Sequence, residues 1–153
     1  MQQNLSEKTE TNKTDFGFFS KNGFLIKEKF FDNSVISAMK NEVFSYLNSF
    51  DINNTLNGED FLYEDNSQTL RLIRNVHNNN KTFANIINDV RLFNLVENLA
   101  GRKLEVINTK VNFKNGFTGG HFDWHQDSIY LGKKNENAMA LIVAIDDISH
   151  ENG

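Results

Sequence analysis

The sequence lacks cysteine altogether, and this absence restricts the chemistry open to the chain. Without cysteine there are no disulfides and no thiolate ligands, so any metal must be held by His, Asp, Glu or backbone oxygen. The chain also has no run of Lys or Arg, and its formal net charge is -4. Because proteins that bind nucleic acid or anionic membranes carry a basic footprint, we expect neither as a partner.

The sequence has no apolar run long enough to cross a bilayer, and its first residues do not have the apolar core of an export signal. Segment 1–15, MQQNLSEKTETNKTD, is polar and predicts a loose leader. Without an export signal, the expected compartment is the cytoplasm. The 153 residues, 39% of them hydrophobic, suit one domain, and 14 Phe predict an aromatic-rich core.

The first hundred residues carry mainly helical patterns. The segment from Asn22 to Phe31 predicts a short strand that leads into a helix. After Asp32, a candidate N-cap, helical spacing predicts a helix over 33–49 whose apolar face is Val35, Met39, Val43, Leu47 and Phe50. Residues 51–68 predict a long loop. A second helix is predicted over 81–99, ending before Gly101, with a buried face of Phe83, Ile86, Ile87, Val90, Phe93, Val96 and Leu99.

From Lys103 the apolar period changes to that of strands. Ile107, Thr109, Val111 and Phe113 alternate with polar residues, and HFDWHQDSIYL and AMALIVAIDDI predict two further strands. Helices followed by antiparallel strands predict an α+β or jelly-roll-like fold. The sequence stops on a turn dipeptide after a strand, which predicts that residues 16–153 are the N-terminal part of one longer domain.

The stretch GHFDWHQD contains two overlapping His-x-Asp patterns, one at His121 and Asp123 and one at His125 and Asp127. On a strand, all four side chains would share one face. A His and a carboxylate two residues apart can hold one cation from adjacent corners of an octahedron, as in the two-His-one-carboxylate triad of non-haem iron oxygenases. Periodicity alone does not choose between the two pairs, and hydrogen-bonded structural histidines are the alternative.

Four segments of the chain resemble, in order and spacing, the phytanoyl-CoA dioxygenase family, which includes ectoine-hydroxylase-like enzymes. They are NGFLIKEKFFDNSVISAMKNEV, NDVRLFNLVENLAGRKLEVINTKVNFKNG, FDWHQDSIYLG and AIDDISHENG. The most specific piece is WHQD, followed by a strand and then DD-x-x-x-x-NG. The resemblance implies a double-stranded β-helix, cupin-like, that uses iron(II), 2-oxoglutarate and O2 to hydroxylate a C–H bond of a small molecule, with release of succinate and CO2.

The resemblance also implies roles for particular residues. It selects the second His-x-Asp pair, so that His125 and Asp127 are the metal ligands and the catalytic centre. It places Asn112, Asn108 and Phe122 in the 2-oxoglutarate pocket. Residues on the substrate side or behind the ligands are then Trp124, Gln126, His121 and Asp123. Related halogenases have a small residue in place of the metal-binding carboxylate, so the presence of Asp127 favours hydroxylation.

The sequence departs from the family pattern at its end. The distal histidine of the family and the arginine that pairs with the 2-oxoglutarate carboxylate have no counterpart, and we expect both beyond Gly153. His150 lies in the acidic turn and is not expected to be a ligand. Two alternatives stay open: a non-catalytic β-helix domain that binds a ligand or partner, and a metal-dependent cupin-like enzyme without oxidative chemistry. The substrate and the oligomeric state are not predicted.

Overall fold

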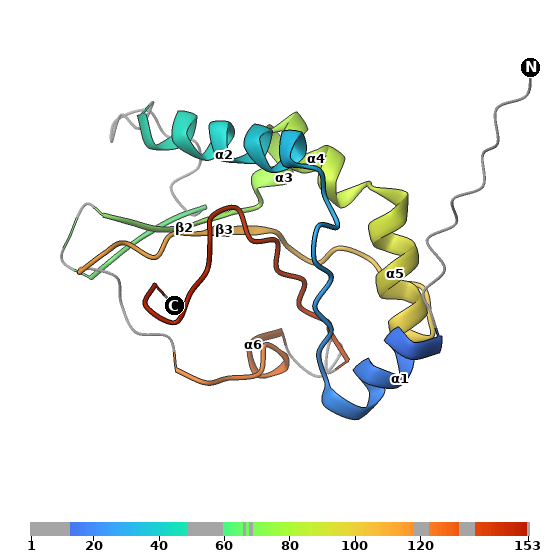
Figure 1. Cartoon of the computed structure of the whole chain (residues 1–153). Coiled ribbons are helices and arrows are strands. Elements are labelled where there is room, and N and C mark those ends of the chain that lie inside the picture. The colour runs from blue at the N-terminus through green and yellow to red at the C-terminus, as the bar shows by residue number, and fades with distance from the viewer. Residues whose placement is uncertain are drawn as a thin grey trace, which may run out of the picture.

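Figure 1 shows the computed structural model of the chain, which describes residues 13–48, 60–65, 67, 69–117, 123–131 and 137–152. A three-stranded antiparallel sheet lies at the centre, with its strands in the order β1-β2-β3. These strands are β1 (Phe61–Tyr63), β2 (Leu70–Arg74) and β3 (Lys110–Asn112). The helices are α1 (Lys13–Asn22), α2 (Asn33–Asn48), α3 (Val76–Asn79), α4 (Lys81–Ile87), α5 (Val90–Ala100) and α6 (Ser128–Leu131).

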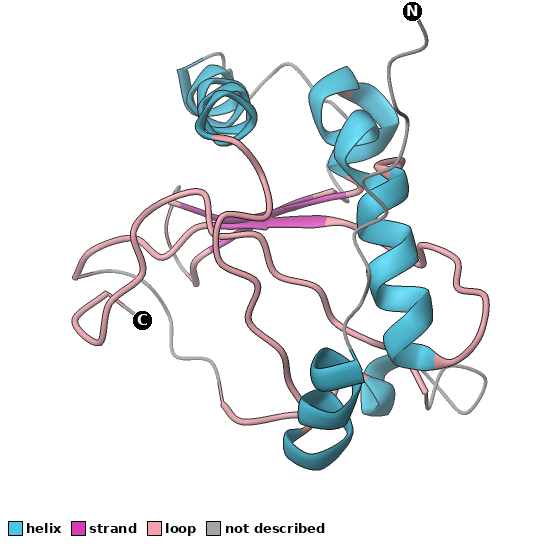
Figure 2. Ribbon diagram, turned by 45° about the vertical axis from the view of Figure 1, so that its right-hand side comes forward, coloured by secondary structure: helices cyan, strands magenta, loops and turns pink. Residues whose placement is uncertain are grey.

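The sheet separates α2 from α6. Helices α2, α3 and α4 lie along one side of the sheet in Figure 1. In Figures 1 and 2, α6 lies on the opposite side. The predicted α+β class is confirmed at this level: helices pack on a small antiparallel sheet. The predicted order, with helices before strands, is wrong, because β1 and β2 stand between α2 and α3.

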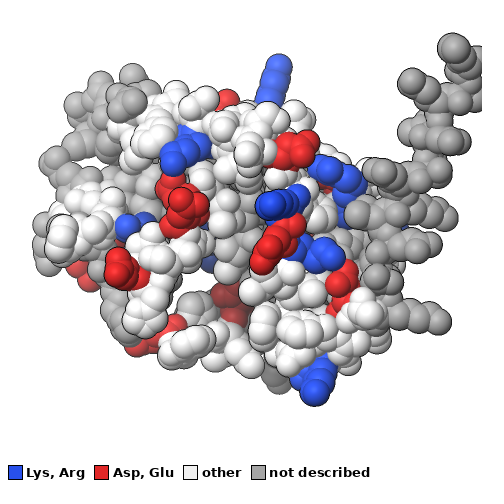
Figure 3. Space-filling model, viewed as in Figure 1, with Lys and Arg blue, Asp and Glu red and all other residues white. Residues whose placement is uncertain are grey.

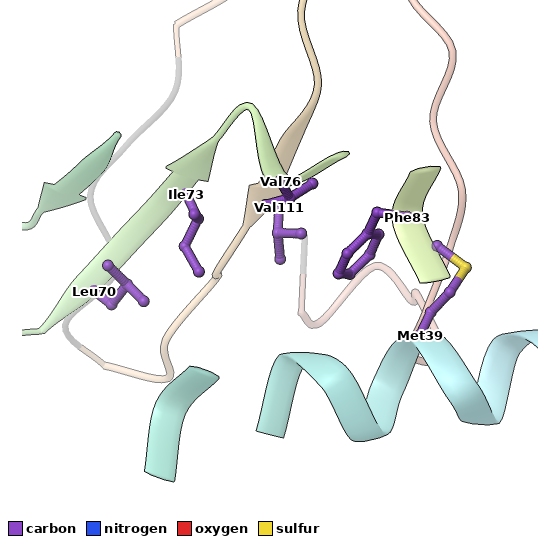
Figure 4. Close-up of a cluster of buried hydrophobic side chains, with 6 residues drawn as sticks. All are labelled: Met39, Leu70, Ile73, Val76, Phe83 and Val111. Atoms are coloured by element: carbon purple, nitrogen blue, oxygen red, sulfur yellow. The ribbon is translucent and has the colours of Figure 1, made fainter. Parts of the chain in front are cut away.

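A small apolar core fills the space between α2 and the sheet (Figure 4). Ile73 of β2 is 3% exposed and stands opposite Phe61 of β1 and Val111 of β3. The buried residues of this cluster are Met39, Leu70, Ile73, Val76, Phe83 and Val111. Full burial of one large apolar side chain contributes roughly 1.5–3 kcal/mol, so this cluster helps to hold α2 against the sheet.

Helix α2 confirms the helix predicted over 33–49. The carbonyl of Asp32 accepts hydrogen bonds from the N–H groups of Val35 and Ile36, which starts the helix where the sequence places its N-cap. Met39 is buried, and Val35 and Val43 pack beside it against the core. Leu47 is 42% exposed near the last turn. Phe50 lies outside the described residues.

The single helix predicted over 81–99 is wrong, because the chain divides it into α4 and α5. The side-chain amide of Asn88 donates to the carbonyl of Ala84 (2.7 Å), which closes α4. Asp89 then accepts a hydrogen bond from the N–H of Arg91 (2.8 Å) and caps α5. The break rotates the apolar face, so Val90 is 67% exposed and Leu92 is buried in its place. Gly101 does end α5 as predicted, and it adopts the left-handed conformation.

The strand predicted over 22–31 is wrong, since Asn22 and Gly23 end a helix instead. Helix α1 begins at Lys13, inside the expected leader, and Gly23, at φ 80°, donates its N–H to the carbonyl of Phe19 (2.8 Å). A glycine that follows a helix commonly closes it with such a hydrogen bond, because glycine adopts the left-handed conformation readily. The loop predicted over 51–68 is also partly wrong, because it contains β1; residues 51–59, 66 and 68 lie outside the described ranges.

The strands predicted after Lys103 are mostly wrong. Among the described residues after Lys103, only Lys110–Asn112 forms a strand, although Thr109, Val111 and Phe113 do face inward in alternation. In the described residues of HFDWHQDSIYL, 123–126 are irregular and the rest begin α6. AMALIVAIDDI is not assigned to a strand. A strand needs a second strand to satisfy its backbone, whereas the α6 turn satisfies its own backbone locally, from Tyr130 N–H to the carbonyl of Asp127 (2.9 Å).

Segment 137–152 is tied to the core although it forms no strand in its described residues. Val143 and Ile145 pack against the core cluster. Lys40 of α2 donates a hydrogen bond to Asp146, and this bond raises the pKa of Lys40. Lys and Arg are interspersed with Asp and Glu on the face seen in Figure 3. In the part of the chain that the structure describes, no helix combines the length and the apolar character needed to span a membrane.

The cap at Asp89 gives a testable pH dependence. The hydrogen bond from the Arg91 guanidinium lowers the pKa of Asp89. A carboxylate with a lowered folded pKa contributes stability that is present above its unfolded pKa of about 3.9 and lost as pH falls through the folded value. We expect Asp89→Ala to reduce the free energy of unfolding by about 1 kcal/mol at neutral pH, and by less at acid pH, in urea denaturation.

The matched control is Glu105→Ala, which removes an exposed carboxylate outside the helices. We expect it to change the free energy of unfolding by less than about 0.5 kcal/mol. An Asp89→Ala loss of the same size at neutral and acid pH would contradict the role of the carboxylate charge.

Candidate functional site

The candidate site lies in residues 123–131, on the side of the sheet away from α2 (Figures 1 and 2). Residues 123–126 run without regular structure into the single turn of α6. His125 and Asp127 therefore stand in a local loop-and-turn unit rather than on the strand that the sequence predicts. This unit still brings the two side chains together, because they are only two residues apart.

One hydrogen bond orients the imidazole of His125. Its Nδ1 lies 2.7 Å from the backbone carbonyl oxygen of Asp123. Because a carbonyl oxygen can only accept, Nδ1 must carry the proton and donate it. In the neutral ring, Nε2 is then left with a free lone pair. This is the arrangement by which a backbone carbonyl commonly prepares a histidine to bind a metal through its other nitrogen.

The second nitrogen of His125 faces a carboxylate. Nε2 lies 3.4 Å from Oδ1 of Asp127. With Nδ1 already protonated, both of these atoms are acceptors when the ring is neutral, so their approach is favourable only if a cation lies between them or Nε2 takes a second proton. Two bonds of about 2.1 Å at a right angle would place two donor atoms about 3.0 Å apart, so the pair suits one small divalent ion.

The pair is open to solvent in the described structure. The side chains of His125 and Asp127 are 40% and 45% exposed, and Trp124 is fully exposed. Tyr130 of α6 meets the ring of His125 edge to face, with centroids 5.7 Å apart and planes at 81°. The described residues thus bring an imidazole and a carboxylate together beside an aromatic ring, in a position that is open to solvent.

Sequence reasoning missed Tyr130 because it assumed a strand. In a strand, residues five apart point to opposite faces, so His125 and Tyr130 would not meet. The hydrogen bonds from the N–H groups of Tyr130 and Leu131 to the carbonyl of Asp127 turn the chain back instead. The signal that could have found this contact is a one-turn helix after Asp127, which the sequence marks only weakly.

A third protein ligand is not found among the described residues, where no group of three His, Asp or Glu side chains could share an ion. His150 sits in an exposed turn: Asn152 accepts a hydrogen bond from the N–H of Ser149 (2.7 Å) and donates one to the carbonyl of Asp147 (2.7 Å). The described chain therefore supplies one His and one carboxylate.

The other predicted site residues are less closely grouped. Asp123 and Gln126 are exposed neighbours of the pair. Asn112 is exposed on β3 and lines a cavity of about 230 Å³ between α2, β3 and Ile145, to which His125 and Asp127 do not contribute. Asn108 is exposed before β3 begins. His121 and Phe122 lie outside the described residues.

Comparison with known proteins identifies related sequences over most of the chain. The phytanoyl-CoA dioxygenase (PhyH) family profile matches residues 19–153. An ectoine dioxygenase of Bordetella parapertussis is 27% identical over 139 residues, which are 88% of this chain and 44% of the relative. One from Halomonas elongata is 28% identical over 110 residues, 71% of this chain and 32% of the relative. An L-proline trans-4-hydroxylase of Streptomyces griseoviridis is 29% identical over 94 residues, 59% and 35% of the two chains.

A solved structure shares the fold. It is the crystal structure of EctD from S. alaskensis with bound Fe, which matches with a TM-score of 0.65 and 20% identity, over 81% of this chain and 43% of that chain. The chain thus spans less than half the length of the relatives named here. At this identity the likeness concerns the arrangement of helices and sheet.

The orientation of His125 predicts its tautomer. We expect the neutral imidazole to carry its proton on Nδ1, because the Asp123 carbonyl accepts from that atom. Long-range ¹H–¹⁵N correlation spectra of the labelled metal-free protein measure this directly, with the exposed His150 as the internal comparison. A neutral His125 protonated on Nε2 would show that the Asp123 bond does not hold in solution.

Proposed function

The chain belongs to the phytanoyl-CoA dioxygenase family, and on that premise we propose that it is an iron(II)- and 2-oxoglutarate-dependent dioxygenase that hydroxylates a C–H bond of a small molecule. The observation that carries the proposal is the approach of two acceptors, His125 Nε2 and Asp127 Oδ1, at 3.4 Å. A cation between the two acceptors would make this approach favourable, and a histidine with a carboxylate is half of the facial triad that holds iron(II).

The residues of this pair would divide the work of holding the metal. The carbonyl of Asp123 keeps the proton of His125 on Nδ1, so that Nε2 remains a ligand. The carboxylate of Asp127 offsets part of the charge of a divalent ion. Bound iron(II) would supply the oxidative chemistry, with 2-oxoglutarate and O2 consumed and succinate and CO2 released.

The remaining parts of the site are proposed to come from residues outside the described ranges. These are the third ligand and the cationic partner of the 2-oxoglutarate carboxylate, since the described residues supply only two ligands. Residues 16–153, with the sheet and the helices, would then be the N-terminal part of one double-stranded β-helix domain. Asn112, Asn108 and Phe122 are proposed on the cosubstrate side, as the family resemblance implies.

The proposed substrate is a small molecule. The relatives are named for reactions on ectoine and on L-proline, both small and polar. Trp124 is fully exposed directly beside His125, and with Gln126 it would border the path of the substrate to the metal. His121 and Asp123 are proposed to support the ligands from behind. The cytoplasm is the proposed compartment.

The test is to replace each ligand and follow the metal and the products. We expect His125→Ala and Asp127→Ala each to lower succinate formation by at least about a hundredfold in the intact protein, since loss of a group that only supports a ligand already costs 10–100-fold. In these variants, iron content and the absorbance change on anaerobic addition of 2-oxoglutarate to the iron form should fall together with succinate formation. Asp65→Ala, which removes an exposed carboxylate between β1 and β2, is the control.

Two outcomes count against the proposal in different ways. Unchanged iron content and succinate formation in Asp127→Ala would remove Asp127 from the site. A wild-type protein that binds iron at His125 but shows no absorbance change with 2-oxoglutarate would indicate a metal-dependent enzyme without oxidative chemistry.

A further inference from the structure

We propose that Tyr130 is a positioning residue for the metal-binding histidine: its ring holds the imidazole of His125 in the orientation that directs Nε2 at Asp127. This inference rests on the proposed function for its metal, but the contact itself can be tested without one. It is carried by the edge-to-face packing of the two rings, at 5.7 Å and 81°.

The imidazole of His125 has few other restraints. A side chain that is 40% exposed keeps much of its rotamer freedom, and ordering it costs free energy. The hydrogen bond from Nδ1 to the Asp123 carbonyl fixes one edge of the ring. A second contact is needed to stop the ring from swinging about that bond into solvent. Among the described residues, the ring of Tyr130 makes an aromatic contact with His125.

The backbone of α6 brings Tyr130 to this place. The carbonyl of Asp127 accepts hydrogen bonds from the N–H groups of Tyr130 (2.9 Å) and Leu131 (3.0 Å). These bonds fold the chain back so that the residue three positions after one ligand packs on the other ligand. Asp127 thus has two parts in the arrangement: its carboxylate faces Nε2, and its carbonyl anchors the turn that carries Tyr130.

The exposure of Tyr130 fits a role in orientation better than a role in the core. Its side chain is 76% exposed, so the ring contributes little to apolar burial. Ile129, beside it on α6, is equally open at 75%. The ring of Tyr130 nevertheless lies against the imidazole in edge-to-face geometry, and such aromatic pairs are favourable beyond their buried area.

Three variants separate the role of the ring from that of the helix. Tyr130→Phe keeps the ring, Tyr130→Leu removes it, and Ile129→Leu alters the neighbouring side chain of α6. For the intact protein titrated with Co²⁺ as a stable substitute for iron(II), we expect Tyr130→Leu to weaken binding roughly two- to tenfold, with Tyr130→Phe and Ile129→Leu close to wild type.

A second readout needs no metal. The chain has four histidines, so the imidazole ¹H signals of His125 can be assigned by comparison with His125→Gln. In the metal-free protein we expect these signals to move in Tyr130→Leu, because the ring current of Tyr130 is lost, and to stay in place in Tyr130→Phe. Circular dichroism of each variant checks that the fold is kept.

The outcomes distinguish this inference from the proposed function. If wild type binds no Co²⁺ but the His125 signals respond as expected, the ring contact holds and the metal assignment fails. If Tyr130→Leu leaves both the signals of His125 and the Co²⁺ affinity unchanged, Tyr130 does not position the ligand. Equal weakening in Ile129→Leu would attribute the effect to α6 as a whole, which also overturns the proposal.

Discussion

The packing of α2 on the sheet is the constraint on which the rest of the described structure depends. Met39 and Ile73 are both almost fully buried, and Ile73 pairs with Val111, so this contact holds β3 in place. The segment that carries the candidate site follows β3. Burial of apolar side chains fixes the position of β3, and with it the start of the segment that follows, but it is not directional. Directional hydrogen bonds are needed to aim the side chains within it.

The candidate site depends on local contacts. Asp123, His125, Asp127 and Tyr130 lie within one short stretch, where the imidazole bonds the Asp123 carbonyl, faces the Asp127 carboxylate and meets the Tyr130 ring edge to face. The proposed ligand pair is thus oriented before a metal arrives, even while it is exposed. A backbone carbonyl and an aromatic ring, rather than a buried pocket, restrain the side chains of this pair. A closed pocket requires further residues around the pair.

The sequence predicts the parts of this molecule that are decided locally. Helix α2 follows from the spacing of Val35, Met39 and Val43, and the His125–Asp127 pair follows from the His-x-Asp pattern with its family resemblance. The break at Asn88 and Asp89 was missed because periodicity continues across it while the side chains close one helix and cap the next.

The strands were mispredicted for a different reason. Alternation of side chains describes an extended chain, but a strand needs a partner, and the partner of β3 is β2, nearly forty positions earlier in the sequence. The error also concealed the contact between Tyr130 and His125.

The most direct test of metal binding by His125 and Asp127 is anomalous diffraction at the iron edge from crystals of the iron-loaded protein. We expect a peak bonded by His125 Nε2 and Asp127 Oδ1, at about 2.0–2.2 Å from each; iron bound elsewhere, with this pair ordered and unoccupied, would contradict the proposed metal site.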